Sequence, residues 1–190
     1  MAIKKRPVSP RQKMINLMYV VLMAMLALNV STEVLNGFSI VEESLNRTTN
    51  NSSKENQALY SDFEAQMKSN PEKVKAWFDK AREVRRMSDS LYNFADELKI
   101  AIVKEADGKN GDVHNIVSKE DLEASTQVML APGRGQGKQL FNSINSFRER
   151  ILKMISDEGQ KAIIRSNLST QIPKKAHALG KNWQEYLFEN

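Results

Sequence analysis

The glycine-rich segment that ends at Lys138 is a candidate phosphate-binding loop, judged by its residue types and their spacing. Residues 133–138 read GRGQGK. A phosphate-binding loop would need a glycine where Pro132 stands and a serine or threonine where Gln139 stands, so that a hydroxyl can meet magnesium. The strand that such a loop must follow is also missing from the pattern. The sequence therefore predicts a loop that connects two helices.

Other residues with catalytic or ligand chemistry are sparse. The chain has no cysteine, which excludes a thiol nucleophile, a disulfide framework and cysteine-based zinc sites. His114 and His177 lie far apart and in no metal-ligand spacing. We therefore expect no catalytic residue, no metal and no cofactor, and we interpret the protein as a non-enzyme.

Three polar side chains stand out because they accompany an apolar run. Residues 14–30 read MINLMYVVLMAMLALNV, and no residue there is ionised at neutral pH. Inside hydrocarbon, Asn16 and Tyr19 would need hydrogen-bond partners, although Tyr19 could instead sit in an interfacial belt. Arg11 falls in the first helical turn, where the helix dipole disfavours a cation. Membrane topology can explain Arg11, but an anionic partner explains it better, so all three are candidates for partner binding in the membrane.

The excess positive charge is confined to the N-terminus. The chain carries 28 basic and 23 acidic residues, a net charge of +5. Five basic residues before position 14 account for that excess: Lys4, Lys5, Arg6, Arg11 and Lys13. The rest of the chain is neutral as a whole, so a nucleic-acid-binding face is not expected. Residues 1–13 are instead typical of a cytoplasmic leader.

The apolar run predicts one transmembrane helix over residues 14–31, with residues 32–190 outside the cytoplasm. As a helix, residues 14–30 would span about 25 Å, close to the hydrocarbon thickness of about 30 Å. A cleaved signal peptide has the same layout, but its small-residue cleavage site is poor here. A buried helix of a soluble protein is the other alternative, and the basic leader argues against it.

Small residues near the outer end of this segment predict close helix packing. Ala24, Ala27 and Ser31 would let a second helix approach, although small residues are also ordinary in a lipid-facing helix. Gly37 follows just outside the predicted membrane. It costs about 1 kcal/mol relative to alanine in a helix, and it is either a hinge or a tolerated glycine.

The remaining sequence predicts an all-α, periplasmic helical bundle, because apolar residues recur at helical spacing and no strand alternation is visible. Trp77 belongs to the apolar stripe of a long helix and is expected in the core. Proline, glycine and capping residues give the expected helices: Pro10 to about Thr48, Ser52–Ser69, Pro71 to about Asp107, about Asp121–Leu130, Leu140–Met154, Gln160–Leu168 and Lys174–Phe188.

The N-terminal segment resembles a known family. Residues 10–19 (PRQKMINLMY), 24–29 (AMLALN) and 33–35 (EVL) look like the start of the GldM/PorM family of gliding-motility and type IX secretion proteins, and the leader is closest to the PorM branch. The helical body and the Asn182-Trp183-x-x-Tyr186 segment fit the family's first periplasmic domain.

The resemblance implies a bacterial inner-membrane protein with a cytoplasmic N-terminus. It implies a homodimer whose membrane helices sit inside a ring of a polytopic partner that resembles GldL/PorL, in a motor driven by the proton gradient. Carried over by position, Arg11 would pair with a glutamate of the partner and Tyr19 would contact the ring. Further C-terminal domains, expected beyond this chain, would reach periplasmic or outer-membrane secretion components.

Residues 14–30 contain no Asp, Glu or His, so the predicted span cannot itself carry a proton. The resemblance therefore implies a component that transmits mechanical energy derived from the proton gradient to secretion and gliding, with the proton-carrying group supplied by the partner. A transmembrane sensor or scaffold with a periplasmic helical bundle is the alternative, but it would need a second membrane span that these residues lack.

Overall fold

The structure, a computed structural model, describes residues 9–189, and for residues 26–32 it describes the helical backbone alone. Contacts divide the chain into two units, one ending at Asn56 and the other starting at Gln57. The leader residues Lys4, Lys5 and Arg6, and the side chains of Ala27 and Ser31, lie outside the described residues.

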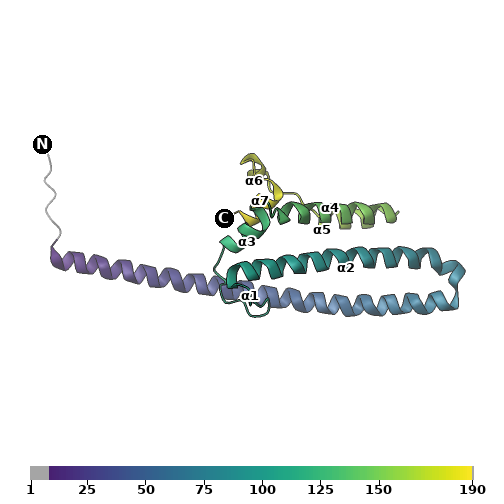
Figure 1. The fold of residues 1–190 in the computed structure, drawn as a ribbon, viewed down its shortest axis with the longest axis horizontal. Helices are drawn as coiled ribbons and strands as arrows, with labels where there is room; N and C mark the ends of the chain where they lie inside the picture. Colours follow the sequence, from purple (N-terminus) through teal and green to yellow (C-terminus); the bar gives the residue numbers. More distant parts are fainter. Residues whose placement is uncertain (1–8, 190) are drawn as a thin grey trace. The chain divides into compact units, whose positions relative to one another are not determined.

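The described residues are mostly helical and contain no strand, which confirms the predicted all-α class. The one β-type contact among them is an isolated bridge between Asp112 and Asn115. Figure 1 labels the helices in chain order: α1 (Pro10–Ser69), α2 (Pro71–Asp107), α3 (Glu123–Leu130), α4 (Gln136–Met154), α5 (Glu158–Asn167), α6 (Lys174–Ala178) and α7 (Trp183–Phe188).

The sequence Ser9-Pro10-Arg11-Gln12 has the pattern of a capping box, and the start of α1 shows half of it. The Gln12 backbone N–H donates to Ser9 Oγ at 3.3 Å, which satisfies one of the free amides of the first turn. The Gln12 side chain does not return to the Ser9 backbone. Its Nε2 donates instead to Asn16 Oδ1 at 3.2 Å.

The sequence predicts one helix that ends near Thr48 and another that starts at Ser52, with a break in the polar stretch Thr48–Ser53. This prediction is wrong, because α1 continues through the stretch to Ser69. The polar residues there include no proline and no glycine, so nothing forces the backbone out of the helix. Thr48 Oγ1 donates to the carbonyl of Ser44 at 2.9 Å, and an Arg47–Glu43 ion pair bridges one turn. The Thr48 side chain is therefore satisfied within the helix itself.

The last turns of α1 contact α2 through Tyr60. Its hydroxyl donates to the carbonyl of Ala81 at 3.3 Å, and the Arg85 guanidinium lies 5.0 Å from the centre of its ring. Burial raises the pKa of Tyr60 above its ordinary value. Pro71 begins α2 as predicted, but the Asn70 side chain makes no capping hydrogen bond.

Helices α2 and α4 lie side by side and antiparallel (Figure 1). An ion pair between Glu83 and Arg150 joins them at one end. At the other end, Glu105 pairs at 2.7 Å with Arg134, just before α4 begins. The core lies where α3 packs on both helices, and its members are Leu98, Val128 and Met129, surrounded by Phe94, Ala101, Ile102, Leu130, Leu140 and Phe188.

The expected last helix, Lys174–Phe188, is interrupted, and this prediction is corrected. Gly180 has a φ of +75°, a conformation that favours glycine, and it separates α6 from α7. A capping box starts α7: Asn182 Oδ1 accepts from the Glu185 N–H, and the Glu185 carboxylate accepts from the Asn182 N–H, both at 2.9 Å. The Asn-x-x-Glu pattern was a visible signal for this boundary.

Trp77 is not in the core, contrary to the expectation from its place in the apolar stripe. It is 63% exposed. It lies near the turn between α1 and α2, and the Lys80 ammonium stands 4.9 Å from the centre of its ring. A stripe at helical spacing predicts which face is apolar, but another element must also cover that face along its full length.

Asp107 closes the loop between α2 and α3, and this gives a pH prediction. Its two carboxylate oxygens accept from the backbone N–H groups of Val117 and Ser118, each at 2.8 Å. These hydrogen bonds lower the pKa of Asp107 below its ordinary value of 3.8. Because the folded pKa is depressed, the carboxylate stabilises the fold above pH 3.8, and that contribution is lost as the pH falls through the folded pKa.

We therefore expect Asp107→Asn to reduce stability at neutral pH and to flatten the loss of stability below pH 3.8. Urea unfolding midpoints of both proteins between pH 2 and pH 7 would test this. Equal slopes below pH 3.8 in the two proteins would contradict the assigned role.

Gly137 is required by close packing, and Gly137→Ala is expected to destabilise the second unit. A Cβ there would lie 2.9 Å from the Met129 carbonyl oxygen and 2.9 Å from Gln184 Cβ. We expect a loss of about 1–3 kcal/mol, which exceeds the roughly 0.5–1 kcal/mol that alanine gains in a helix. Urea unfolding measures the difference. Gly159→Ala is the control, because its Cβ would meet only the Asp157 side chain, at 3.2 Å.

Candidate functional site

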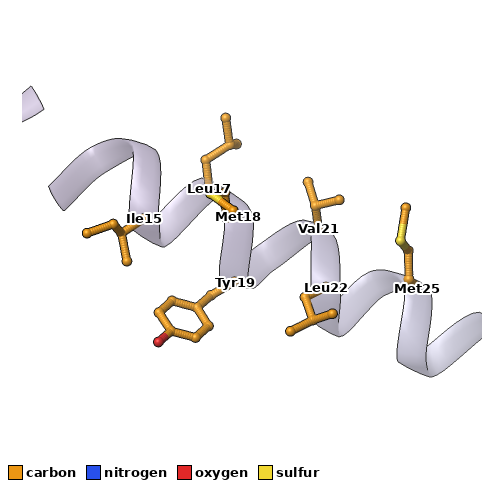
Figure 2. A pocket seen from close by; sticks show the side chains of 7 residues that line it. All are labelled: Ile15, Leu17, Met18, Tyr19, Val21, Leu22 and Met25. Carbon is orange, nitrogen blue, oxygen red and sulfur yellow. The ribbon is translucent and has the colours of Figure 1, made fainter. Parts of the chain in front are cut away.

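The first unit presents an apolar segment that covers the whole circumference of α1. Seven consecutive residues, Leu17–Met23, are large, carry no charge and are exposed. At 3.6 residues per turn, seven positions occupy nearly two turns and leave no polar face. Figure 2 shows side chains of this segment projecting from opposite sides of the helix, among them Leu17, Tyr19 and Val21. One helix alone lines this surface, so it is not an enclosed cavity.

A helix segment that is apolar on every side is typical of a helix surrounded by other apolar groups, in a protein core or in a membrane. Full burial of a large apolar side chain contributes about 1.5–3 kcal/mol, so covering seven of them contributes on the order of 10 kcal/mol. Among the described residues, no helix contains a stretch that is both long enough and apolar enough to cross a membrane. The segment expected at residues 14–31 stays a prediction.

Of the three candidate partner-binding residues, Arg11 and Tyr19 lie on adjacent sides of α1, whereas Asn16 lies toward the side opposite Arg11. At 100° per residue, Tyr19 lies about 80° and Asn16 about 140° around the helix from Arg11. All three are exposed. Asn16 already accepts a hydrogen bond from Gln12, its neighbour one turn earlier, so part of its polar requirement is met within its own helix. In Figure 2 the Tyr19 phenol oxygen points away from the helix axis.

A second, narrower apolar stripe continues along α1 beyond this segment. Its members Val34, Phe38, Val41 and Leu45 follow steps of four, three and four residues, and all are exposed, Phe38 by 68%. Such spacing is typical of a coiled-coil seam. Because the backbone is helical throughout, the same steps lead backwards to the candidate packing positions Ser31, Ala27 and Ala24. We call residues 24, 27, 31, 34, 38, 41 and 45 the seam.

The candidate hinge, Gly37, lies in helical backbone and not in a break. A Cβ at this position would meet nothing within 4 Å. The glycine is therefore not required by packing within this chain, which separates it from Gly137.

The rest of the described chain offers little for catalysis. No three His, Asp or Glu side chains come together there in a way that could hold a metal ion. His114 and His177 are both exposed, and the His114 backbone N–H donates to Asp112 in a loop. The glycine-rich segment connects α3 to α4, as predicted, with Gly133 and Gly135 at positive φ.

Comparison with known proteins gives one family. Residues 33–190 match the family described as GldM N-terminal domain. No curated protein matches the chain. The N-terminal motif that carried the resemblance in the sequence covers residues 10–38, so the two overlap only over residues 33–38. The helical body thus supports the same family almost independently of the motif, whereas the PorM branch stays a prediction.

Proposed function

Because the chain belongs to the GldM N-terminal domain family, which is linked to the motor of gliding and type IX secretion, we propose that it transmits force in that motor. The proposed role is non-enzymatic. The motor would convert the energy of the proton gradient into motion, and the chain would pass that motion across the periplasm. The all-round apolar segment of α1, with Arg11 at its start, is the observation that carries the proposal.

In this proposal residues 1–13 lie in the cytoplasm, residues 14–31 cross the bacterial inner membrane, and residues 32–190 lie in the periplasm. The uncharged run and the basic residues before it support this orientation. The exposed apolar side chains of Leu17–Met23 would then face lipid or neighbouring helices, and not water.

The two faces of α1 suit two different partners. The seam is centred about 170° around the helix from Arg11, that is, on the opposite side. We propose that the seam packs against a second copy in a parallel homodimer, with Ala24, Ala27 and Ser31 allowing close approach. Arg11 would then point outward to a polytopic ring that resembles GldL/PorL. Tyr19 would lie between the two faces, and Asn16, about 30° from the centre of the seam, would lie on the dimer side.

The ring must supply the proton-carrying group in this mechanism. Residues 14–30 have no Asp, Glu or His, so Arg11 can act only as the counter-charge of a carboxylate on the partner. Protonation of that carboxylate would break the ion pair, and deprotonation would remake it. A repeated cycle would move the ring relative to α1, and the helical body would pass the motion to periplasmic or outer-membrane secretion components.

Purification of the chain from membranes, with identification of what copurifies, tests the proposal. We expect two copies of the chain with a polytopic protein that carries an acidic residue within a membrane span. A solitary monomer in mild detergent would contradict both the dimer and the ring. A chain recovered from the soluble fraction would contradict the membrane anchor.

Gly37→Ala tests whether the point just outside the proposed membrane is a hinge. The substitution should stabilise local helix by about 0.5–1 kcal/mol, because no neighbour clashes with the new methyl group. If α1 bends at Gly37 when it transmits motion, the substitution should lower gliding speed or secretion rate while protein levels stay constant. Unaltered motor output would remove the hinge and leave a tolerated glycine.

A further inference from the structure

An open groove of about 490 Å³ lies between α2 and α4, within the second unit. We call it the α2–α4 groove. Helix α2 lines it with Arg86, Met87, Ser90, Leu91 and Phe94, and helix α4 lines it with Gln139, Ser143, Ser146, Phe147 and Arg150. The two helices that form it lie side by side in Figure 1.

The charge of this groove is positive. No Asp or Glu side chain lines it, whereas two guanidinium groups do. Both arginines share one carboxylate, since Glu83 pairs with Arg86 at 2.9 Å and also with Arg150. Two cations therefore face one anion, and both arginine side chains remain more than half exposed. A further carboxylate could be bound there without any change in the fold.

The remaining polar groups of the groove are also available. Within the described residues, the hydroxyls of Ser90, Ser143 and Ser146 and the amide of Gln139 make no side-chain hydrogen bond to the chain. By contrast, Ser61 and Ser69 on α1 each donate a hydrogen bond to the backbone carbonyl four residues earlier in their own helix. The groove thus offers several hydrogen-bond donors to an occupant.

Apolar side chains complete the surface. Met87 is buried, and Leu91, Phe94 and Phe147 are half-buried, so each offers part of its surface to the groove. A cleft between two packed helices, with an apolar base and a cationic group at one end, is the form of site that accepts an amphipathic helix.

From this chemistry we propose that the α2–α4 groove binds an amphipathic helix of another protein, with carboxylates beside its apolar face. The carboxylates pair with Arg86 and Arg150, and the apolar face covers Leu91 and Phe147. A second copy of this chain would offer no complementary charge where the two grooves met on a two-fold axis, because each groove carries the same two arginines. The inference concerns the second unit alone and does not depend on the motor mechanism.

Binding of designed peptides to the whole chain tests the charge preference. The probes are 18-residue helical peptides with leucine at every third or fourth position and glutamate, glutamine or lysine at all others. In about 0.15 M salt we expect the glutamate peptide to bind about tenfold more tightly than the glutamine peptide, and the lysine peptide to bind most weakly. Fluorescence anisotropy of labelled peptides measures this.

Charge reversal locates the site. In the double variant Arg86→Glu and Arg150→Glu the order of the glutamate and lysine peptides should reverse, and in the milder Arg86→Gln and Arg150→Gln variant the preference should disappear. The matched control reverses Arg82 and Arg85, which lie on α2 but outside the groove, and should keep the original order. Equal effects of groove and control variants would overturn the proposal, as would peptide binding without charge preference.

Photo-crosslinking in cells identifies the natural occupant. A photoreactive residue at Ser143 should join a segment of another protein that is amphipathic and acidic, and the glutamine double variant should lose that product. The same probe at Tyr92, an exposed position outside the groove, sets the background. Crosslinks at Ser143 only to lipid, to a second copy or to a basic segment would overturn the proposal. Each outcome leaves the motor function to be judged by its own copurification experiment.

Discussion

Cells whose only copy of the protein carries Arg11→Ala are expected to lose type IX secretion and gliding while the variant accumulates at normal levels. In the proposed motor, Arg11 is the counter-charge of a carboxylate on the ring, because residues 14–30 contain no charged residue. Removing one partner of a buried ion pair costs about 3–5 kcal/mol, since the other charge is left unpaired. That loss falls on the step in which the pair is remade, so the cycle should stop rather than slow slightly.

Two further variants separate this role from a general effect of charge. Arg11→Lys keeps the positive charge but loses the bidentate hydrogen bonding that a guanidinium can make to a carboxylate. This variant should retain part of the activity. Lys13→Ala removes a cation only two residues away and should leave secretion nearly unchanged. Secretion is measured from the amount of substrate in the medium and gliding from cell speed. Normal output of Arg11→Ala at normal protein level would exclude the ion-pair mechanism.

Met129→Ala is expected to give the largest loss of stability among single changes in the second unit. Met129 is 2% exposed and lies in the core cluster with Leu98 and Val128. Truncation to alanine removes most of a buried side chain and leaves a cavity, for which about 2–5 kcal/mol is typical. Since domains are stable by only about 5–15 kcal/mol, the second unit of this variant would be near its unfolding threshold at growth temperature.

Urea unfolding, followed by tryptophan fluorescence, measures this effect. Trp183 lies 5.6 Å from Phe141 and 6.3 Å from Phe188, between ring centres, so its emission reports on the packing of α7 against α4. Leu179→Ala is the control, because Leu179 is 77% exposed and its truncation should change stability by less than about 0.5 kcal/mol. Similar unfolding midpoints for the two variants would show that Met129 is not part of the core.

Helix boundaries divide into those that local chemistry decided and those that it did not. Helix α2 begins at Pro71 and ends at Asp107, before Gly108, as predicted. Proline and glycine decide these boundaries because each acts on the conformation of its own backbone. The Asn182–Glu185 capping box acts in the same way, and its signal was present in the sequence. The Thr48–Ser53 stretch has only weak helix propensity, but it contains no proline or glycine, and the helix continues through it from the neighbouring turns.

The two glycines show why packing roles could not be assigned from the sequence. Gly37 and Gly137 are each glycines within helices, yet only Gly137 lies against other elements, the α3 carbonyl of Met129 and the α7 side chain of Gln184. Those contacts join residues that are distant in the chain. No local pattern distinguishes a glycine required by packing from one that is merely tolerated.

The sequence by itself determined that the chain is helical, that an uncharged apolar run follows Arg11, and that no metal or nucleophile pattern is present. These properties depend on residue type, on spacing along one helix and on residues within a few turns of one another. Only the tertiary structure decided that Trp77 is exposed, that Met129 is buried and that Arg86 and Arg150 meet around Glu83 in the α2–α4 groove. Burial and charge pairing of this kind depend on which elements pack together, and the contacts that decide it connect residues as far apart as positions 83 and 150.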